Sequence, residues 1–171
     1  MPRLDVLVNN AGTNRPLPFL EISEDNFDAV MNLNVRSAYF VAQAAARKMI
    51  EGGAGGSIIN ISSQMGLTGG RNRTVYCASK HALEGMTKAM ALDLAPHHIR
   101  VNTICPTFFE TPLTKPFFEN AEFKRATLSR IALGRLGQVE EIMGAAVYLA
   151  SPAASLVTGS ALVVDGGWTA Q

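Results

Sequence analysis

The sequence has few charged residues and no clear excess of either sign. Of its 171 residues, 15 are lysine or arginine and 14 are aspartate or glutamate, so charged residues make up 17% and the formal net charge is +1. Nucleic acids and anionic membrane surfaces attract proteins through an excess of basic residues. The near-neutral balance therefore predicts no nucleic-acid partner and no binding to a membrane.

Cysteine is also scarce. Cys77 and Cys105 are the only two, which excludes a disulfide framework, and their positions lack the spacing of metal ligands. We therefore expect no metal site. The hydrophobic share of 47% at this length predicts one folded domain over residues 1–171 rather than a disordered chain.

No apolar run is long and unbroken enough to predict a membrane span. The longest stretch without charge, residues 142–164, is interrupted by Ser151-Pro152 and by Gly159. Asp5 interrupts the only apolar run near the N-terminus, so a secretory signal peptide is not predicted either. These absences favour a cytoplasmic protein.

Strand and helix patterns alternate along the chain. Short apolar runs predict strands at 4–9, 57–61, 99–104 and 161–164. Apolar residues at spacings of three and four predict helices at 23–50, 75–95 and 139–150. Ser23 is placed to cap the first helix, and the segment from 107 to about 131 is expected to be irregular. The alternation predicts an α/β fold with a doubly wound parallel sheet, whose strands end at one edge where ligands bind.

A tyrosine and a lysine stand four residues apart in the second predicted helix. Tyr76 and Lys80 therefore project from the same helix face, and Ser63 lies just beyond the second predicted strand. A phenol titrates near 10, so it exchanges protons poorly at neutral pH unless a neighbouring ammonium lowers its pKa. A serine hydroxyl can hold a carbonyl or alcohol oxygen for proton transfer. The three residues form a coherent reductase or dehydrogenase site, although tyrosine and lysine at this spacing are common in helices.

Five short motifs occur in one order along the chain. They are Asn9-Asn10-Ala11-Gly12, Asn60-Ile61-Ser62-Ser63, Tyr76-Cys77-Ala78-Ser79-Lys80, Val101-Asn102-Thr103-Ile104-Cys105-Pro106 and Val164-Asp165-Gly166-Gly167-Trp168. Together they resemble the classical short-chain dehydrogenase/reductase family, in particular ketoreductase members similar to 3-oxoacyl-carrier-protein reductase, over practically the whole chain. The resemblance implies a Rossmann-type fold, NAD or NADP as cofactor, and an oxidoreductase that interconverts a ketone and a secondary alcohol by hydride transfer.

The resemblance implies a role for each residue of the expected catalytic group. Tyr76 is expected to be the general acid/base, and Lys80 to lower its pKa and to hydrogen-bond the nicotinamide ribose. Ser63, thirteen residues before Tyr76, is expected to bind the substrate. Asn34 matches the family's asparagine, which supports a proton-relay water, whereas Asn32 lies two residues too early.

The resemblance also implies which residues contact the cofactor. They are Asn10, Ala11, Gly12, Tyr76, Lys80, Pro106, Thr107, Phe109 and Thr111. The first three are assigned near the adenine ribose, and those after the third predicted strand near the nicotinamide. One position departs from the family, which usually has Pro-Gly where this chain has Pro106-Thr107, and the added Cβ narrows the approach of the backbone to the cofactor.

Phenylalanine is concentrated where the family carries a mobile substrate lid, here residues 107–131. Five of the eight phenylalanines lie between Phe108 and Phe123. Their rings either contact an apolar or ring-containing substrate or pack the lid onto the protein body. The basic residues of the lid either bind an acidic substrate or carrier or form a solvated face. These are Lys115, Lys124, Arg125 and Arg130.

A glycine-rich pyrophosphate loop does not follow any strand of the sequence, and the resemblance begins at the family's fourth strand. In this fold the loop after the first strand anchors the cofactor. Without the family's first three strands, the strand at 4–9 is expected to be an exposed apolar edge. We also expect this chain alone to bind a nicotinamide cofactor weakly or not at all.

Two main functions remain open, and a third, weaker alternative keeps the fold but replaces the redox chemistry with a lyase or isomerase step. An active enzyme would act on a small-molecule carbonyl or alcohol substrate and, by the resemblance, form a homodimer or homotetramer. The alternative is a catalytically inactive, truncated family member that serves as a structural or oligomerisation subunit. Such a subunit would pair with full-length relatives through the helices at 23–50 and 75–95, which the family uses as a four-helix dimer interface.

Overall fold

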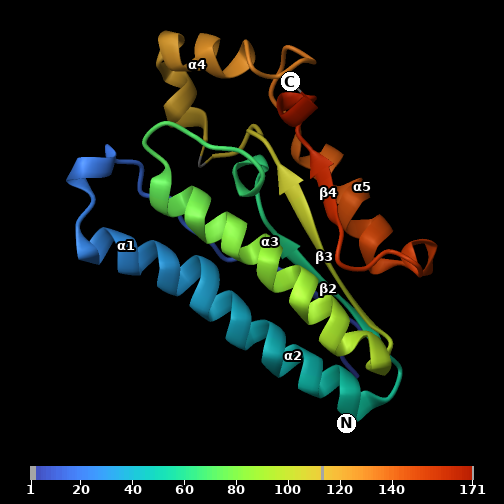
Figure 1. Cartoon of the computed structure of the whole chain (residues 1–171). Coiled ribbons are helices and arrows are strands. Elements are labelled where there is room, and N and C mark those ends of the chain that lie inside the picture. The colour runs from blue at the N-terminus through green and yellow to red at the C-terminus, as the bar shows by residue number, and fades with distance from the viewer. Residues whose placement is uncertain (1–2, 113, 171) are drawn as a thin grey trace.

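The computed structural model describes residues 3–112 and 114–170, which contain a four-stranded sheet (Figure 1). Its strands are β1 (Val6–Asn9), β2 (Gly56–Ile61), β3 (Ile99–Pro106) and β4 (Ala161–Val164). They lie in the order β1-β2-β3-β4, and each neighbouring pair is parallel. All four predicted strands are confirmed, with small shifts at their ends. Leu113, within the predicted lid, lies outside the described residues.

Helices cover both faces of the sheet. In the described part of the chain the α-helices are α1 (Glu24–Met31), α2 (Ala38–Gly52), α3 (Thr74–Leu94), α4 (Ala121–Leu128) and α5 (Val139–Ala150). The apolar contacts place α2 and α3 on one face and α5 on the other, as Figure 1 shows. This is the predicted α/β arrangement of a doubly wound, Rossmann-type sheet.

The two apolar cores lie on opposite faces because successive side chains of a strand alternate. On β2, Ile58 and Ile59 are both fully buried. Ile58 belongs to the core beneath α2 and α3, whereas Ile59 belongs to the core beneath α5. Continuous burial of this kind is typical of a parallel sheet covered on both sides. The strands are thereby held in place, with their carboxyl ends at one edge.

The helix predicted over 23–50 has a wider turn in its middle. Ser23 caps the first segment as predicted, because its hydroxyl accepts a hydrogen bond from the Asn26 backbone N–H at 3.2 Å. Between α1 and α2, however, Asn32–Ser37 form a π-helix. Apolar spacing does not reveal such a turn, which changes the backbone hydrogen-bond partners over only a few residues. Asn34 lies within it, and π-turns are frequent at functional sites.

The expectation of an irregular segment from 107 to about 131 is wrong in part. A 3-10 helix, Lys115–Glu119, and α4 lie within it. The Asn120 side chain caps α4 by accepting from the Phe123 backbone N–H at 2.9 Å. With eight residues, α4 is too short to be stable without tertiary packing, so its sequence alone does not predict it.

Aromatic rings supply that packing. The Phe108 ring meets the rings of Phe118, Phe123 and Trp168 at centroid distances of 5.7–5.9 Å. The Arg130 guanidinium lies over the Trp168 ring, 4.7 Å from its centroid. Of the two interpretations of the phenylalanine cluster, these contacts support packing of the segment onto the protein body.

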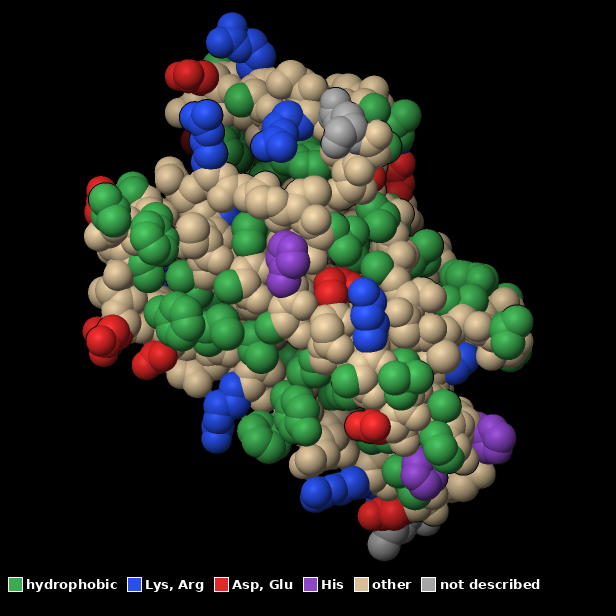
Figure 2. Space-filling view, viewed as in Figure 1, with side chains coloured by type: hydrophobic (Ala, Val, Ile, Leu, Met, Phe, Trp, Pro, Cys, Tyr) green, Lys and Arg blue, Asp and Glu red, His purple; other side chains and the backbone are tan. Residues whose placement is uncertain are grey.

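β1 forms one edge of the sheet and leaves apolar surface uncovered. Within the described residues it pairs with β2 alone, so the predicted exposed edge is confirmed. Val8 is 48% exposed, although Ile59, its neighbour in register, is fully buried. Phe40 and Leu92 of the helices are exposed too, and Figure 2 shows hydrophobic groups gathered on the helical side. None of the described helices is long and apolar enough to cross a membrane.

Candidate active site

The carboxyl edge of the parallel sheet gathers residues from distant parts of the chain. Gly12 follows β1, Ser63 follows β2, and Pro106 ends β3. Tyr76 and Lys80 lie in the first two turns of α3, which packs against β3 and against the turn after β2. The fold thereby brings to one edge residues that are up to 94 positions apart in the sequence, from Gly12 to Pro106, as parallel strands with their ends at one edge require.

Lys80 reaches from α3 to the end of β2. It is 5% exposed, and its Nζ donates a hydrogen bond to the Ile61 carbonyl oxygen at 2.8 Å. A Cβ on Gly12 would lie 3.7 Å from Nζ, so the loop after β1 also approaches the ammonium. Burial lowers the pKa of Lys80 to about 8, while Cys105 and Glu84 act to raise it. The charge of Lys80 therefore depends on its neighbours near neutral pH.

Tyr76 is half-buried on α3, and its ring centroid lies 5.6 Å from Lys80 Nζ. Burial raises the pKa of Tyr76, whereas the hydrogen bond with Ser63 and the charge of Arg73 lower it, and the net direction is upward. In this structure, loss of hydration outweighs the neighbours that lower the pKa. The lowering by Lys80 that the resemblance implies stays a prediction. The phenol stays protonated at neutral pH, as a proton donor must.

Neighbouring groups orient the Ser63 hydroxyl. Ser63 is 6% exposed, and its Oγ donates to Gln64 Oε1 at 2.7 Å and accepts from the Met65 backbone N–H at 3.1 Å. These bonds cap the 3-10 helix Gln64–Gly66, which turns the chain from the end of β2 toward α3. The hydroxyl and the Tyr76 phenol can hold one oxygen atom between them.

Asn34 ties the π-helix to the loop after β1 and to α3. It is 1% exposed, and its Nδ2 donates to the Thr13 carbonyl oxygen at 2.9 Å and to Ser79 Oγ at 3.0 Å. Its Oδ1 accepts from the Thr13 backbone N–H at 2.8 Å and would lie 3.3 Å from a Cβ on Gly12. Asn32, the other candidate, is exposed. The structure therefore places Asn34, and not Asn32, against α3.

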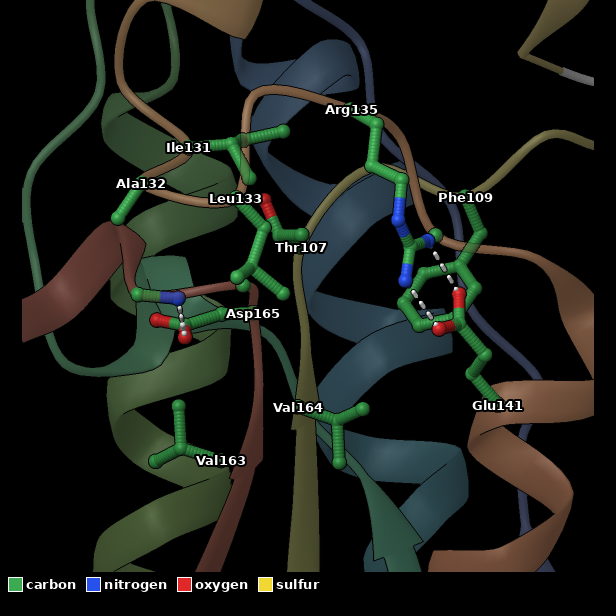
Figure 3. Close-up of a pocket in the computed structure, with 13 residues that line it drawn as sticks. Thr107, Phe109, Ile131, Ala132, Leu133, Arg135, Glu141, Val163, Val164 and Asp165 are labelled. Atoms are coloured by element: carbon green, nitrogen blue, oxygen red, sulfur yellow. Dashed lines mark hydrogen bonds and ion pairs between the residues drawn. The ribbon is translucent and has the colours of Figure 1, made fainter.

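Three of the predicted cofactor residues after β3 line cavities of the structure. Thr107 and Phe109 line a cavity of about 430 Å³, together with Val164 and Asp165 from the end of β4 (Figure 3). Thr111 lines a second cavity of about 690 Å³. Among the described residues that line either cavity, none belongs to α3. On the other side of the site, Asn10 and Ala11 are exposed next to Gly12.

Four polar residues that hold the site were missed by sequence reasoning. They are Gln64, Arg73, Ser79 and Glu84. Ser79 lies inside the Tyr76–Lys80 motif, so the sequence offered a reason to consider it as a site residue. Its Oγ accepts a hydrogen bond from Asn34 Nδ2. The other three lie outside the motifs, and their roles depend on contacts that only the folded chain makes.

These residues together can transfer a proton to or from a bound oxygen. Tyr76 carries a hydroxyl proton, Ser63 carries a hydroxyl that can hydrogen-bond an oxygen, and Lys80 Nζ lies 5.6 Å from the centroid of the phenol ring. Within the residues that the structure describes, no group of three or more His, Cys, Asp or Glu side chains is placed to bind a metal ion.

Known proteins share both the sequence and the fold. The family described as Enoyl-(Acyl carrier protein) reductase matches residues 1–169. The 2-dehydro-3-deoxy-D-gluconate 5-dehydrogenase of Dickeya dadantii (strain 3937) is 43% identical over 169 residues, 99% of this chain and 67% of that relative. The 3-oxoacyl-[acyl-carrier-protein] reductase of Thermotoga maritima is 44% identical over 165 residues, 96% of this chain and 66% of the relative. The structure of a gluconate 5-dehydrogenase from Burkholderia cenocepacia J2315 in complex with NADP and tartrate has a TM-score of 0.95 at 40% identity and covers 99% of this chain and 66% of that one.

A doubly wound parallel sheet that gathers polar residues at its carboxyl edge defines a Rossmann-type protein. The matches identify it further: the chain belongs to the short-chain dehydrogenase/reductase family. The predicted resemblance is confirmed, including the similarity to 3-oxoacyl-carrier-protein reductase. The chain spans about two thirds of the length of these relatives.

Proposed function

We propose that this chain carries the proton-transfer site of an NAD(P)-dependent oxidoreductase that interconverts a ketone and a secondary alcohol. The observation that supports the proposal most is the gathering of Ser63, Tyr76 and Lys80 at one edge of the sheet, with Asn34 packed beside them. Family membership supports a redox reaction, because the relatives are named as dehydrogenases and reductases.

In the reducing direction Tyr76 acts as the general acid. The Ser63 hydroxyl holds the substrate oxygen next to the phenol, and Tyr76 Oη gives its proton to that oxygen as it becomes an alcohol. A bound nicotinamide supplies the hydride for the carbonyl carbon. The Lys80 ammonium stabilises the phenolate that remains. Asn34 holds the loop after β1 in place and supports a proton-relay water. Alcohol oxidation reverses these proton transfers.

The residues present fit the nicotinamide half of such a cofactor. Thr107 Oγ1 is buried and has no hydrogen-bond partner among the described residues, so it is free to bind a polar group. Glycine at position 12 keeps the surface beside Asn34 open. We assign to the cofactor, NAD or NADP, the residues Asn10, Ala11, Gly12, Tyr76, Lys80, Pro106, Thr107, Phe109 and Thr111. The gluconate 5-dehydrogenase solved with NADP supports this choice of cofactor.

We further propose that the substrate is a small carbonyl or alcohol compound that the lid, residues 107–131, covers. Two relatives named for gluconate derivatives support a small polar substrate. Lys115 and Lys124 line the cavity of about 690 Å³ together with Glu110 and Glu119, so the charges of its lining are balanced and do not favour an acidic substrate. A homodimer or homotetramer in the cytoplasm completes the proposal.

The test is oxidoreductase activity of this chain fused to the third of the Dickeya dadantii relative that it does not match. Consumption of NADH and NADPH with a panel of ketones is followed by absorbance. Tyr76→Phe removes the transferable proton, so the rate is expected to fall at least about 100-fold. Tyr148→Phe, on α5, is the matched control and is expected to keep activity. Full activity of the Tyr76→Phe variant contradicts the proposed mechanism.

A structural or oligomerisation subunit without catalysis is the second candidate. The exposed apolar side chains Phe27, Phe40 and Leu92 favour it, because such groups mark protein contacts when they gather. This candidate predicts a stable complex with a full-length relative, measured by sedimentation velocity, and no activity in the fused chain. Activity that requires Tyr76 excludes it as the sole function.

A further inference from the structure

Glu84 is a buried carboxylate that the proposed mechanism does not use. It lies on α3 one helical turn beyond Lys80 and is 7% exposed. A Cβ on Gly66 would come within 3.3 Å of Glu84 Cγ, so the turn after β2 closes over this side chain. Carboxylates are rarely buried unless they are paired or hydrogen-bonded. Its position therefore requires an explanation.

Two donors from β3 hold the Glu84 carboxylate in one orientation. Thr103 Oγ1 donates to Oε2 at 2.9 Å, and Cys105 Sγ donates to Oε1 at 3.2 Å. Burial and the nearby Glu84 charge raise the pKa of Cys105 to about 12, so the thiol remains a hydrogen-bond donor. Both carboxylate oxygens are thus satisfied away from Lys80, and no ion pair within 4.0 Å joins the two side chains in the described part of the chain. Glu84 acts on Lys80 through space.

We propose that Glu84 is a positioning residue whose buried carboxylate, fixed by Thr103 and Cys105, keeps Lys80 as an ammonium beside Tyr76. This inference rests on the proposed function, in which that ammonium stabilises the tyrosinate. Burial favours the neutral amine of Lys80, because an ammonium loses hydration in this site. The negative charge of Glu84 one helical turn away favours the ammonium and so opposes that effect. Glu84 itself touches no reacting atom.

The other elements packed against this part of α3 leave Glu84 as the carboxylate that faces Lys80. β2 and the 3-10 helix Gln64–Gly66 carry no titratable side chain. β3 contributes Cys105, which raises the pKa of Lys80 only as a thiolate and stays a thiol below about pH 12. The acidic residues of α1 are exposed, and Arg36 of the π-helix lies over the Phe40 ring. On α3 itself Tyr76 lies on the other side of Lys80, and so does Arg73, the residue that precedes the helix.

The experiment titrates Lys80 in the folded chain and needs neither cofactor nor substrate. The five lysines are labelled with 13C at Cε, their NMR signals are followed against pH, and Lys80→Arg assigns the Lys80 signal. Glu84→Gln removes the charge and keeps the shape. It is expected to lower the pKa of Lys80 by about one pH unit, a tenfold loss in the ratio of ammonium to amine. Glu84→Asp keeps the charge, and the pKa of Lys80 in this variant is expected to stay close to that in the unmodified chain.

The controls separate charge from packing. Asp93→Asn removes an exposed carboxylate from the same helix and is expected to leave Lys80 unchanged. If Glu84→Gln titrates like the unmodified chain, the proposal is overturned, whether or not Glu84→Asp shifts the titration. If Glu84→Gln does not fold by circular dichroism, Glu84→Met removes the same charge with an apolar side chain, and the same shift is expected. If Glu84→Gln leaves the pKa of Lys80 unchanged while the fused chain shows activity that requires Tyr76, this inference alone is overturned. If the fused chain shows no such activity, the proposed function fails, and the measured effect of Glu84 on the pKa of Lys80 is unaffected.

Discussion

Burial governs the charge of individual residues in this site. Loss of hydration moves the pKa of Lys80 down and those of Tyr76 and Cys105 up, in each case toward the neutral form. The sequence predicted that Tyr76 and Lys80 share a helix face, because helix periodicity is local. It did not predict the direction of the tyrosine shift, because hydration depends on atoms of β2 and β3 that close over α3.

The lowered pKa of Lys80 predicts how stability varies with pH. Between about 8, its value in the folded chain, and its ordinary value of 10.5, the unfolded chain binds the additional proton. Raising the pH through this range therefore favours folding. Relative to Lys80→Met, the unmodified chain is expected to gain about 3 kcal/mol of unfolding free energy by pH 10.5. Urea unfolding at several pH values measures this.

The matched control is Lys88→Met, at an exposed position of the same helix. The difference in unfolding free energy between Lys88→Met and the unmodified chain is expected to stay constant over the same pH range. A Lys80→Met difference that is equally flat contradicts a lowered pKa for Lys80.

Among the elements, the π-helix Asn32–Ser37 does most to position a site residue. Its buried Asn34 side chain bonds the loop after β1 and Ser79 of α3, so three segments share one set of hydrogen bonds. The sequence predicted a helix here and a role for Asn34, but not the wider turn. Likewise, α4 depends on rings that meet only after folding.

Asn34→Ala is expected to lower the free energy of unfolding by about 3 kcal/mol. The substitution leaves the Thr13 backbone groups without their side-chain partner and opens a small void. Asn32→Ala, at an exposed position of the same π-helix, is expected to change it by less than about 0.5 kcal/mol. Urea unfolding of both variants measures the difference. Equal effects of the two substitutions contradict a special role of Asn34.

Two features of the whole molecule lead to predictions: the exposed edge strand β1, and the part of the relatives' length that this chain matches. β1 has an unpaired side within the described residues, and Val8 is 48% exposed there. Relatives that are about half as long again carry residues that this chain does not match. The first observation predicts how the chain associates with itself, and the second predicts how it binds the cofactor.

The unpaired edge strand β1 predicts that copies of this chain associate with one another. Val8→Lys places a charge on the exposed face of β1, which opposes pairing of strand edges and contact of apolar faces. It is expected to lower the associated fraction several-fold in static light scattering. Leu156→Lys is the matched control, because it adds the same charge in place of a side chain that is 97% exposed. If both variants reduce association equally, β1 is not the contact.

Cofactor binding by the chain alone is expected to be weak. The described residues include no glycine-rich turn between a strand and a following helix, and such a turn supplies the pyrophosphate contacts in this fold. Titration with NADH and with NADPH, followed by nicotinamide fluorescence, is expected to show no saturation at micromolar concentrations. The fused chain described above is expected to saturate. Micromolar binding by the unfused chain is the contrary outcome.

The sequence by itself determined the alternation of strands and helices, the parallel sheet, and the identities of Ser63, Tyr76 and Lys80. These follow from local periodicity and from motifs whose residues stand close together in the chain. Only the tertiary structure decided the π-turn at Asn34, the existence of α4, the upward pKa shift of Tyr76, and the hydrogen bonds from Thr103 and Cys105 that hold the buried Glu84 carboxylate. Each of these depends on hydrogen bonds, ring contacts or lost hydration between segments far apart in the sequence, and no local pattern records such contacts.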